Sequence, residues 1–160
     1  MAFFQILISV IGRICLSGIF ILGGVQKVLN WHDYEEVVTR TLCDWHVYNT
    51  QFGNIEPFLD FALSYVPVIL GVIVFLELLG GLFVLFGIKA RLGAFFLILF
   101  LVPATIAMHP FWLIHGERHG IEMDQAIKNG AILGGLLLVL AYGTGFPRRA
   151  RFARREGSDK

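Results

Sequence analysis

Two oppositely charged residues interrupt long apolar runs, Arg13 in the run that begins at Phe3 and Glu77 in the run that begins near Phe58. Each charge lies roughly ten positions, or about 15 Å at the helical rise, from the side of the membrane predicted below to be the inner one. An isolated charge in hydrocarbon costs at least about 2.5–3.5 kcal/mol, and arginine can bind a carboxylate through two parallel hydrogen bonds. Because consecutive membrane helices are antiparallel, we predict that Arg13 pairs with Glu77 near mid-membrane.

The predicted pair has two interpretations, which the sequence leaves open. A buried ion pair can hold two helices in register, since such pairs often contribute specificity rather than stability. Ionisable residues inside a membrane are also candidate functional groups. In that role Arg13 and Glu77 would bind a polar headgroup, a proton or a redox ligand.

A second set of polar residues lies near the opposite, outer ends of the apolar runs: Lys27, His109, Lys128 and Asn129. All four fall within about two helical turns of that surface. The lysine side chains can extend to the lipid headgroups, which is the favoured role for Lys128. The amide of Asn129 lies deeper and needs a hydrogen-bond partner. We therefore expect Lys27, His109 and Asn129 to form an outer polar cluster.

Two of the five histidines, His115 and His119, have the i, i+4 spacing of metal ligands on a helix. Gly116 and Gly120 argue against a helix at this position. The cysteine and carboxylate patterns of metal sites are also missing around them. The sequence therefore predicts no metal site, and we expect these residues to be ordinary loop histidines.

These polar groups must be positioned by membrane helices, because 56% of the 160 residues are hydrophobic and only 16% are charged. Soluble domains carry about 25% charged residues. About 20 apolar residues cross the hydrocarbon, and four runs are long enough: residues 3–29, 66–88, 92–108 and 126–146. Pro67 separates the second run from residues 58–66, which we expect to approach the membrane along its surface. The sequence thus predicts an all-α membrane protein, a four-helix bundle in a single domain over residues 1–147.

The segment between the first two spans is predicted to contain a short amphipathic helix. Asp33 precedes Glu36 by three residues, which is a capping-box spacing. Val38, Leu42 and Trp45 then follow near helical spacing. We expect this helix to lie on the outer membrane surface, with its aromatic side chains among the headgroups.

The distribution of charge predicts the orientation. The turn at residues 87–91 contains Lys89 and Arg91, and the predicted tail at residues 148–160 is densely basic. The segment at residues 30–57 instead carries one arginine and five acidic residues. Since lysine and arginine collect on the cytoplasmic side, we expect a multi-pass protein of the bacterial inner membrane with both termini in the cytoplasm. The net charge of +1 gives no reason to expect a nucleic-acid partner.

Three segments together resemble the DoxX family of small four-helix membrane proteins. In chain order they are RICLSGIFILGGVQKV at residues 13–28, ELLGGLFVLFGIKARLGA at residues 77–94 and KNGAILGGLLLVLAYGTG at residues 128–145. The resemblance extends over nearly the whole chain and implies a four-helix bundle. Some members are similar to the quinone-reducing subunit of thiosulfate:quinone oxidoreductase, so the resemblance also implies a redox setting.

We therefore expect a membrane subunit of a redox system that binds a quinone-like or lipid-like small molecule inside the bundle. Arg13 with Glu77, or Lys27 with Asn129, could bind the carbonyl oxygens of a quinone, which is the one cofactor expected. The sequence contains no haem-ligand pair, flavin motif or redox dithiol, so electrons would come from a partner oxidoreductase or a diffusible reductant. The alternative is a non-enzymatic scaffold or a small-solute carrier. Because four spans are few for a transporter, a carrier would act as a homo-oligomer in the bilayer.

Overall fold

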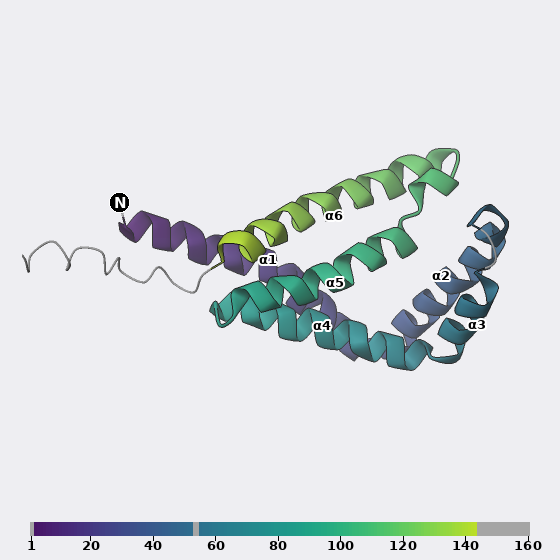
Figure 1. The fold of residues 1–160 in the computed structure, drawn as a ribbon, viewed down its shortest axis with the longest axis horizontal. Helices are drawn as coiled ribbons and strands as arrows, with labels where there is room; N and C mark the ends of the chain where they lie inside the picture. Colours follow the sequence, from purple (N-terminus) through teal and green to yellow (C-terminus); the bar gives the residue numbers. More distant parts are fainter. Residues whose placement is uncertain (1, 53–54, 144–160) are drawn as a thin grey trace, which may run out of the picture.

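The computed structural model describes residues 2–52 and 55–143, which contain helices and no β-strand (Figure 1). Four of the helices are long and apolar enough to cross a membrane. In chain order the elements are α1 (Ala2–Leu29), α2 (Trp31–Phe52), α3 (Glu56–Ser64), α4 (Val66–Phe86), α5 (Ala90–Met108), the 3-10 helix η1 (Phe111–Leu113) and α6 (Glu117–Tyr142). For these residues the predicted all-α membrane fold with four candidate spans is confirmed.

The four long helices form an open arc, not a closed ring. α4 and α5 pack on each other as an antiparallel pair, α1 packs on α4, and α6 packs on α5, while α1 and α6 share few contacts (Figure 1). The bundle has two ends along the direction of its helices. One end contains the tight α4–α5 turn and is called the turn end below. The opposite end contains α2 and α3 and is called the hairpin end. The arc therefore leaves a gap in the packing between its first and last helices.

Glycine and proline residues set the ends of the helices at the α4–α5 turn and before α4. Pro67 lies in the first turn of α4, where its missing N–H is not needed. Gly87 ends α4 in the left-handed conformation, with φ 68°, and Lys89 then adopts φ 50° before α5 begins. This turn reverses the chain within three residues and places the two central helices side by side.

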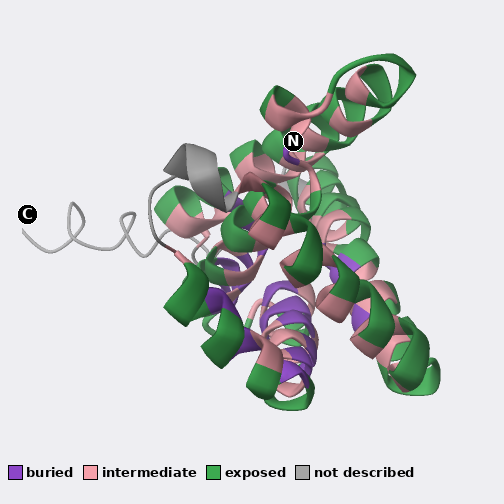
Figure 2. Ribbon diagram, turned by 90° about the vertical axis from the view of Figure 1, so that its right-hand side faces the viewer, coloured by how far each residue is buried: buried purple, intermediate pink, exposed green. Residues whose placement is uncertain are grey.

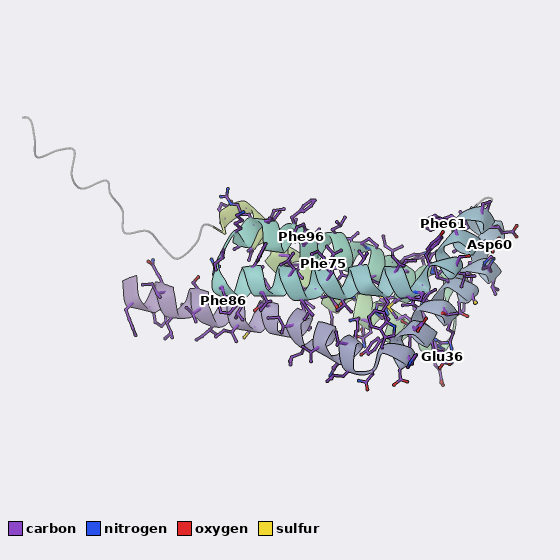
Figure 3. All side chains as sticks on the ribbon, turned by 90° about the horizontal axis from the view of Figure 1, so that it is seen from below. Glu36, Asp60, Phe61, Phe75, Phe86 and Phe96 are labelled. Carbon is purple, nitrogen blue, oxygen red and sulfur yellow. The ribbon has the colours of Figure 1, made fainter. Side chains whose placement is uncertain are left out.

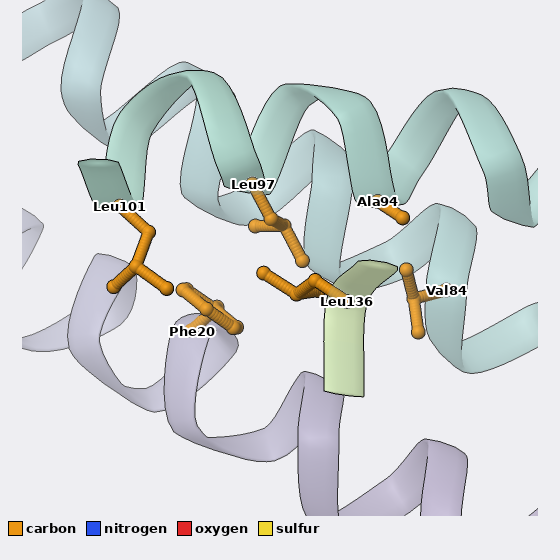
Figure 4. Packing of buried hydrophobic residues seen from close by; sticks show 6 residues of the cluster. All are labelled: Phe20, Val84, Ala94, Leu97, Leu101 and Leu136. Carbon is orange, nitrogen blue, oxygen red and sulfur yellow. The ribbon is translucent and has the colours of Figure 1, made fainter. Parts of the chain in front are cut away.

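The central helices touch where glycine replaces a side chain. A Cβ atom on Gly93 would lie 2.7 Å from the carbonyl oxygen of Gly80, so each helix needs glycine at this crossing. Next to the crossing lies the apolar core of the bundle, to which α1, α4, α5 and α6 all contribute (Figure 4). Its buried members are Phe20, Val84, Ala94, Leu97, Leu101 and Leu136.

Large apolar side chains cover the outside of the bundle. Buried positions are confined to the faces where helices meet, and most of the outer surface is exposed (Figure 2). On α4, Phe75 and Phe86 point outward and are 60% and 58% exposed (Figure 3). Apolar surface of this extent is untenable in water and is ordinary in hydrocarbon. The surface therefore agrees with the membrane class that composition predicts.

Three span boundaries differ from their prediction by two residues or more. The third span begins at Ala90, before residue 92. The second span ends at Phe86, before residue 88, because Gly87 terminates the helix. The fourth helix begins at Glu117, nine residues before the predicted start at residue 126. Counting apolar residues missed this polar first part, because a helix continues as long as its backbone hydrogen bonds continue. The predicted end of this span at residue 146 and the predicted basic tail at residues 148–160 lie outside the described residues.

The segment between the first two spans contains two helices, where the sequence predicted one short helix. α2 has 22 residues, and α3 adds nine more. α2 begins at Trp31, so Asp33 lies within its first turn and is not the predicted cap. Polar residues gather on the exposed face of α2: His32, Asp33, Glu36, Arg40 and Asp44.

Candidate functional site

A buried ion pair joins α1 to the middle of α4. Glu77 is 3% exposed and is the one charged side chain among the described residues that is classed with the buried core. The ammonium of Lys27 donates hydrogen bonds to both carboxylate oxygens of Glu77, at 3.0 and 2.9 Å, and a longer one to the Gly23 carbonyl oxygen at 3.5 Å. A pair with this geometry satisfies both charges where water is scarce.

Small and aromatic residues surround the ion pair. A Cβ atom on Gly24 would lie 2.8 Å from the side chain of Leu78, so glycine is what lets α1 approach α4 beside Glu77. The Lys27 ammonium lies 5.3 Å from the ring centroid of Tyr34 on α2 and 5.7 Å from that of Phe100 on α5. Both rings present a cation–π contact that further stabilises the ammonium. Four helices thus meet around one lysine.

The structure does not bring Arg13 to Glu77. The Arg13 guanidinium instead donates to the Val84 carbonyl oxygen, at 3.2 Å, in the last turn of α4. Our prediction counted residues from the inner end of each run, which is the start of the first run and the end of the second, and so assumed that these two ends lie at the same depth. α1 has 28 residues against 21 in α4, and its first part extends beyond the end of α4. Because of this offset, Glu77 pairs with Lys27, a residue that the sequence analysis assigned to the outer cluster.

Two arginines stabilise helix ends at the turn end of the bundle. Arg13 reaches the last turn of α4, and Arg91 on α5 donates to the Ala141 carbonyl oxygen, at 3.0 Å, in the last turn of α6. The final carbonyl groups of a helix lack partners within it and carry partial negative charge. A guanidinium is therefore favourable at each position, and this gives Arg13 a structural role.

The predicted outer cluster of Lys27, His109 and Asn129 is divided among three separate pairs. His109 Nδ1 lies 2.8 Å from a carboxylate oxygen of Glu122, and the amide of Asn129 donates to the Thr105 hydroxyl at 3.0 Å. These two contacts join the end of α5 to the first part of α6. Asn129 was expected to need a partner, and the sequence did not indicate which one.

The two histidines with metal-like spacing have different surroundings. His119 lies in the first turn of α6, and its Nδ1 is 2.9 Å from the Phe111 carbonyl oxygen and 3.1 Å from that of Ile114. His115 precedes the helix. The i, i+4 spacing therefore does not place the two rings on one helix face, and the absence of a metal site stays a prediction.

A groove of about 810 Å³ runs along the gap between α1 and α6. Ligand pockets typically have volumes of about 300–1,000 Å³. Most of the lining is apolar or small, with Gly12 and Leu16 on α1 and Gly135 on α6. Arg13 is the one charged residue of the lining, and Tyr142 adds a phenol. The groove thus combines an apolar wall with a charged hydrogen-bond donor, which is a suitable environment for an amphipathic molecule.

Removing one member of the Lys27–Glu77 pair should destabilise the protein more than removing both. Glu77→Gln or Lys27→Met strands a buried charge, which typically costs about 3–5 kcal/mol, whereas the double change leaves none. Urea or dodecyl-sulfate unfolding in mixed micelles measures these free energies.

A matched control is the exposed pair of Arg40 with Glu36, whose atoms are 2.7 Å apart on the surface of α2. Glu36→Gln should change the free energy of unfolding by less than about 1 kcal/mol. Strictly additive losses at Lys27 and Glu77 would show that the two side chains are not coupled.

Comparison with known protein families matches residues 8–110 to the DoxX family. The match begins within α1 and extends past the end of α5, so it includes both members of the ion pair and Arg13. No curated protein and no solved structure matched the chain in the corresponding comparisons. The matched region is well over half of the chain, and the protein therefore belongs to the DoxX family.

Proposed function

We propose that the protein binds a quinone-like or lipid-like small molecule in the groove between α1 and α6. In this proposal it is the membrane subunit of a redox system. A partner oxidoreductase or a diffusible reductant supplies the electrons, and the bound molecule is the cofactor. The proposal rests above all on the groove itself, because it joins a long apolar wall to the guanidinium of Arg13.

The chemistry of the lining supports this ligand class. An isoprenoid or acyl chain favours apolar and small side chains, such as Gly12, Leu16 and Gly135. A quinone carbonyl or lipid ester oxygen accepts a hydrogen bond, and the guanidinium of Arg13, which is a hydrogen-bond donor, lines the groove. Because α1 and α6 share few contacts, a molecule dissolved in the bilayer can enter from the side.

The ion pair has a different role in this proposal. Lys27 lies 14 residues from Arg13 along α1, or roughly 21 Å at the helical rise, so one small headgroup cannot contact both. We assign a structural role to Lys27 and Glu77. Their ion pair holds α1 against α4, which keeps the α1 wall of the groove in place. The sequence analysis considered two ligand-binding pairs, Arg13 with Glu77 and Lys27 with Asn129. Of these four residues, only Arg13 contacts the ligand in this proposal.

We further propose that the turn end faces the cytoplasm of a bacterial inner membrane. Lys89 and Arg91 lie at this end, and the contact of Arg91 with Ala141 brings the end of α6 to the same side. The hairpin end would then face outward. There the polar face of α2 meets water, and the exposed Phe58 and Phe61 of α3 lie at the membrane surface, where aromatic residues favour the headgroup region.

Filling the groove should remove the ligand. Gly12 lines the groove with no atom near its Cβ position, so Gly12→Leu fills the space without a clash. Gly134 on α6 also has open space and does not line the groove, so Gly134→Leu is the matched control. We expect quinone extracted by organic solvent from purified protein, per chain, to fall about tenfold or more in Gly12→Leu and in Arg13→Met, since losing a hydrogen bond to a charged group costs about 1.5–3 kcal/mol.

Equal quinone content in the native chain and in the Gly12→Leu, Arg13→Met and Gly134→Leu variants would place any bound quinone outside the groove. Loss of quinone in Gly134→Leu as well would show a general effect of adding bulk. Either result contradicts the proposed site.

Reporter fusions test the orientation. A periplasm-active and a cytoplasm-active enzyme fused near Glu56, and after residue 160, should report opposite sides, with the C-terminal fusion in the cytoplasm. The reason is the basic turn at Lys89 and Arg91, which resists translocation. Fusions that report the same side at both positions would refute the four-span arrangement, and inverted signals would refute the orientation.

A further inference from the structure

The groove between α1 and α6 is polar in one half and apolar in the other. The side chain of Leu16 on α1 lies 3.4 Å from the Cβ position of Gly135 on α6, so these two residues are level with each other. Because the two helices run in opposite directions (Figure 1), equal helical rise places Ser9 opposite Tyr142, toward the turn end. The charged and hydroxyl-bearing residues of the lining all lie on this side of Leu16: Ser9, Arg13 and Tyr142. Toward the hairpin end the lining is apolar: Ile19, Ala131 and Ile132.

The hydroxyl of Ser9 is available to a molecule in the groove. Serine and threonine in a helix commonly donate to the carbonyl oxygen four residues earlier. Several hydroxyls of this chain make that bond: Ser17, Thr39, Thr41, Ser64 and Thr105. Ser9 makes no hydrogen bond with the described part of the chain, and it is half-buried in the groove wall. A ligand oxygen can therefore accept the Ser9 proton.

Tyr142 supplies a second hydroxyl from the α6 wall. Its phenol also makes no hydrogen bond within the residues that the structure describes. The neighbouring Ala141 carbonyl oxygen accepts the bond from Arg91, at 3.0 Å, which holds the last turn of α6 against α5. Lys89 and Arg91 place a membrane boundary at this end, where tyrosine rings are favoured. The groove thus has one hydroxyl on each wall at its turn end.

Gly12 leaves open space between the two polar residues of α1. It directly precedes Arg13, and no atom lies within 4 Å of its Cβ position. Ser9 and Arg13 are four residues apart, so they lie about one helical turn from each other on the same face. A six-membered ring laid against Gly12 has Arg13 at one edge and Ser9 with Tyr142 at the opposite edge. The two carbonyl oxygens of a quinone lie at opposite edges of such a ring, and each accepts hydrogen bonds.

We infer that the ligand is a quinone whose ring lies in the turn-end half of the groove, an inference that rests on the proposed function. Ser9 and Tyr142 donate to the carbonyl oxygen nearer the turn end, and Arg13 donates to the other. The isoprenoid chain follows the apolar half past Ile19 toward the middle of the membrane. Reduction of a quinone to a quinol adds a pair of electrons from the donor and a pair of protons. A ring in this position receives both from the turn end, which is the cytoplasmic side in the proposed orientation.

Photoaffinity labelling of the full chain in phosphatidylcholine nanodiscs tests the position of the ring. The probe is a ubiquinone analogue with an azide on the ring, and the competitors are decylubiquinone and phosphatidylglycerol. We expect mass spectrometry to find the label on residues 9–13 and 138–143, and decylubiquinone alone to prevent labelling. Label on residues 16–19 and 131–135 instead would overturn the orientation of the ring and leave the groove as the binding site. Equal competition by phosphatidylglycerol would overturn the assignment of a quinone.

Removing either hydroxyl should weaken binding of the probe. We expect Ser9→Ala and Tyr142→Phe each to raise its apparent Kd about 2- to 10-fold, because each loses one hydrogen bond to the ring. The matched controls are Ser64→Ala and Tyr65→Phe, the same changes at residues that do not line the groove.

An unchanged Kd in Ser9→Ala and Tyr142→Phe, or an equal change in the controls, would overturn the role of the two hydroxyls. Absence of saturable labelling in the native chain would overturn the proposed function together with this inference. Failure of the inference alone is recognised by saturable labelling at the wrong end of the groove or by hydroxyl variants that bind normally.

Discussion

The Lys27–Glu77 ion pair is the constraint on which the arrangement of the bundle depends. A carboxylate that is 3% exposed in the middle of a membrane helix requires a cation within hydrogen-bonding distance. Lys27 supplies it from the last turn of α1, and Gly24 permits the close approach of the two helices there. Once this contact is made, every other residue of α1 has its depth set relative to α4.

That depth explains three features that otherwise look unrelated. Arg13 falls level with the last turn of α4 and stabilises its carbonyl groups. The first turns of α1 extend beyond the end of α4 and expose apolar side chains, with Phe3 and Phe4 80% and 65% exposed. At the hairpin end, α2 begins two residues after α1 ends and packs on the first half of α4.

α2 contacts the bundle at its start and again farther along the helix. At its start, the ring of Trp31 lies 3.9 Å from the Cβ position of Gly71, in the half of α4 toward the hairpin end. Farther along, Trp45 donates from its indole nitrogen to the Ala107 carbonyl oxygen of α5, at 2.8 Å. The long segment between the first two spans thus packs on the bundle. Its aromatic residues, which the sequence analysis expected at the headgroups, include two that make these packing contacts.

The all-α membrane fold could be predicted from the sequence, because the length of an apolar run can be compared directly with the thickness of the hydrocarbon layer that it must cross. The partner of Glu77 could not, because a residue's depth depends on where its helix starts relative to its neighbours. The same limit separated Lys27, His109 and Asn129, which share a depth in a count along the chain and contact different helices. The need of Glu77 and Asn129 for partners was predictable from chemistry, whereas the identities of Lys27 and Thr105 required the packing of α1 and α6.

The register of α1 on α4 is tested most directly by an intramolecular disulfide, in a chain whose native cysteines are replaced by alanine. A Cβ atom on Gly81 would lie 2.7 Å from Cγ1 of Ile21, so cysteines at residues 21 and 81 are within reach of each other. If Arg13 were instead level with Glu77, residue 9 would lie opposite Gly81. The account predicts rapid disulfide formation between residues 21 and 81, detected by mass spectrometry of the digested protein, and none between residues 9 and 81. A disulfide between residues 9 and 81, with none between 21 and 81, would contradict it.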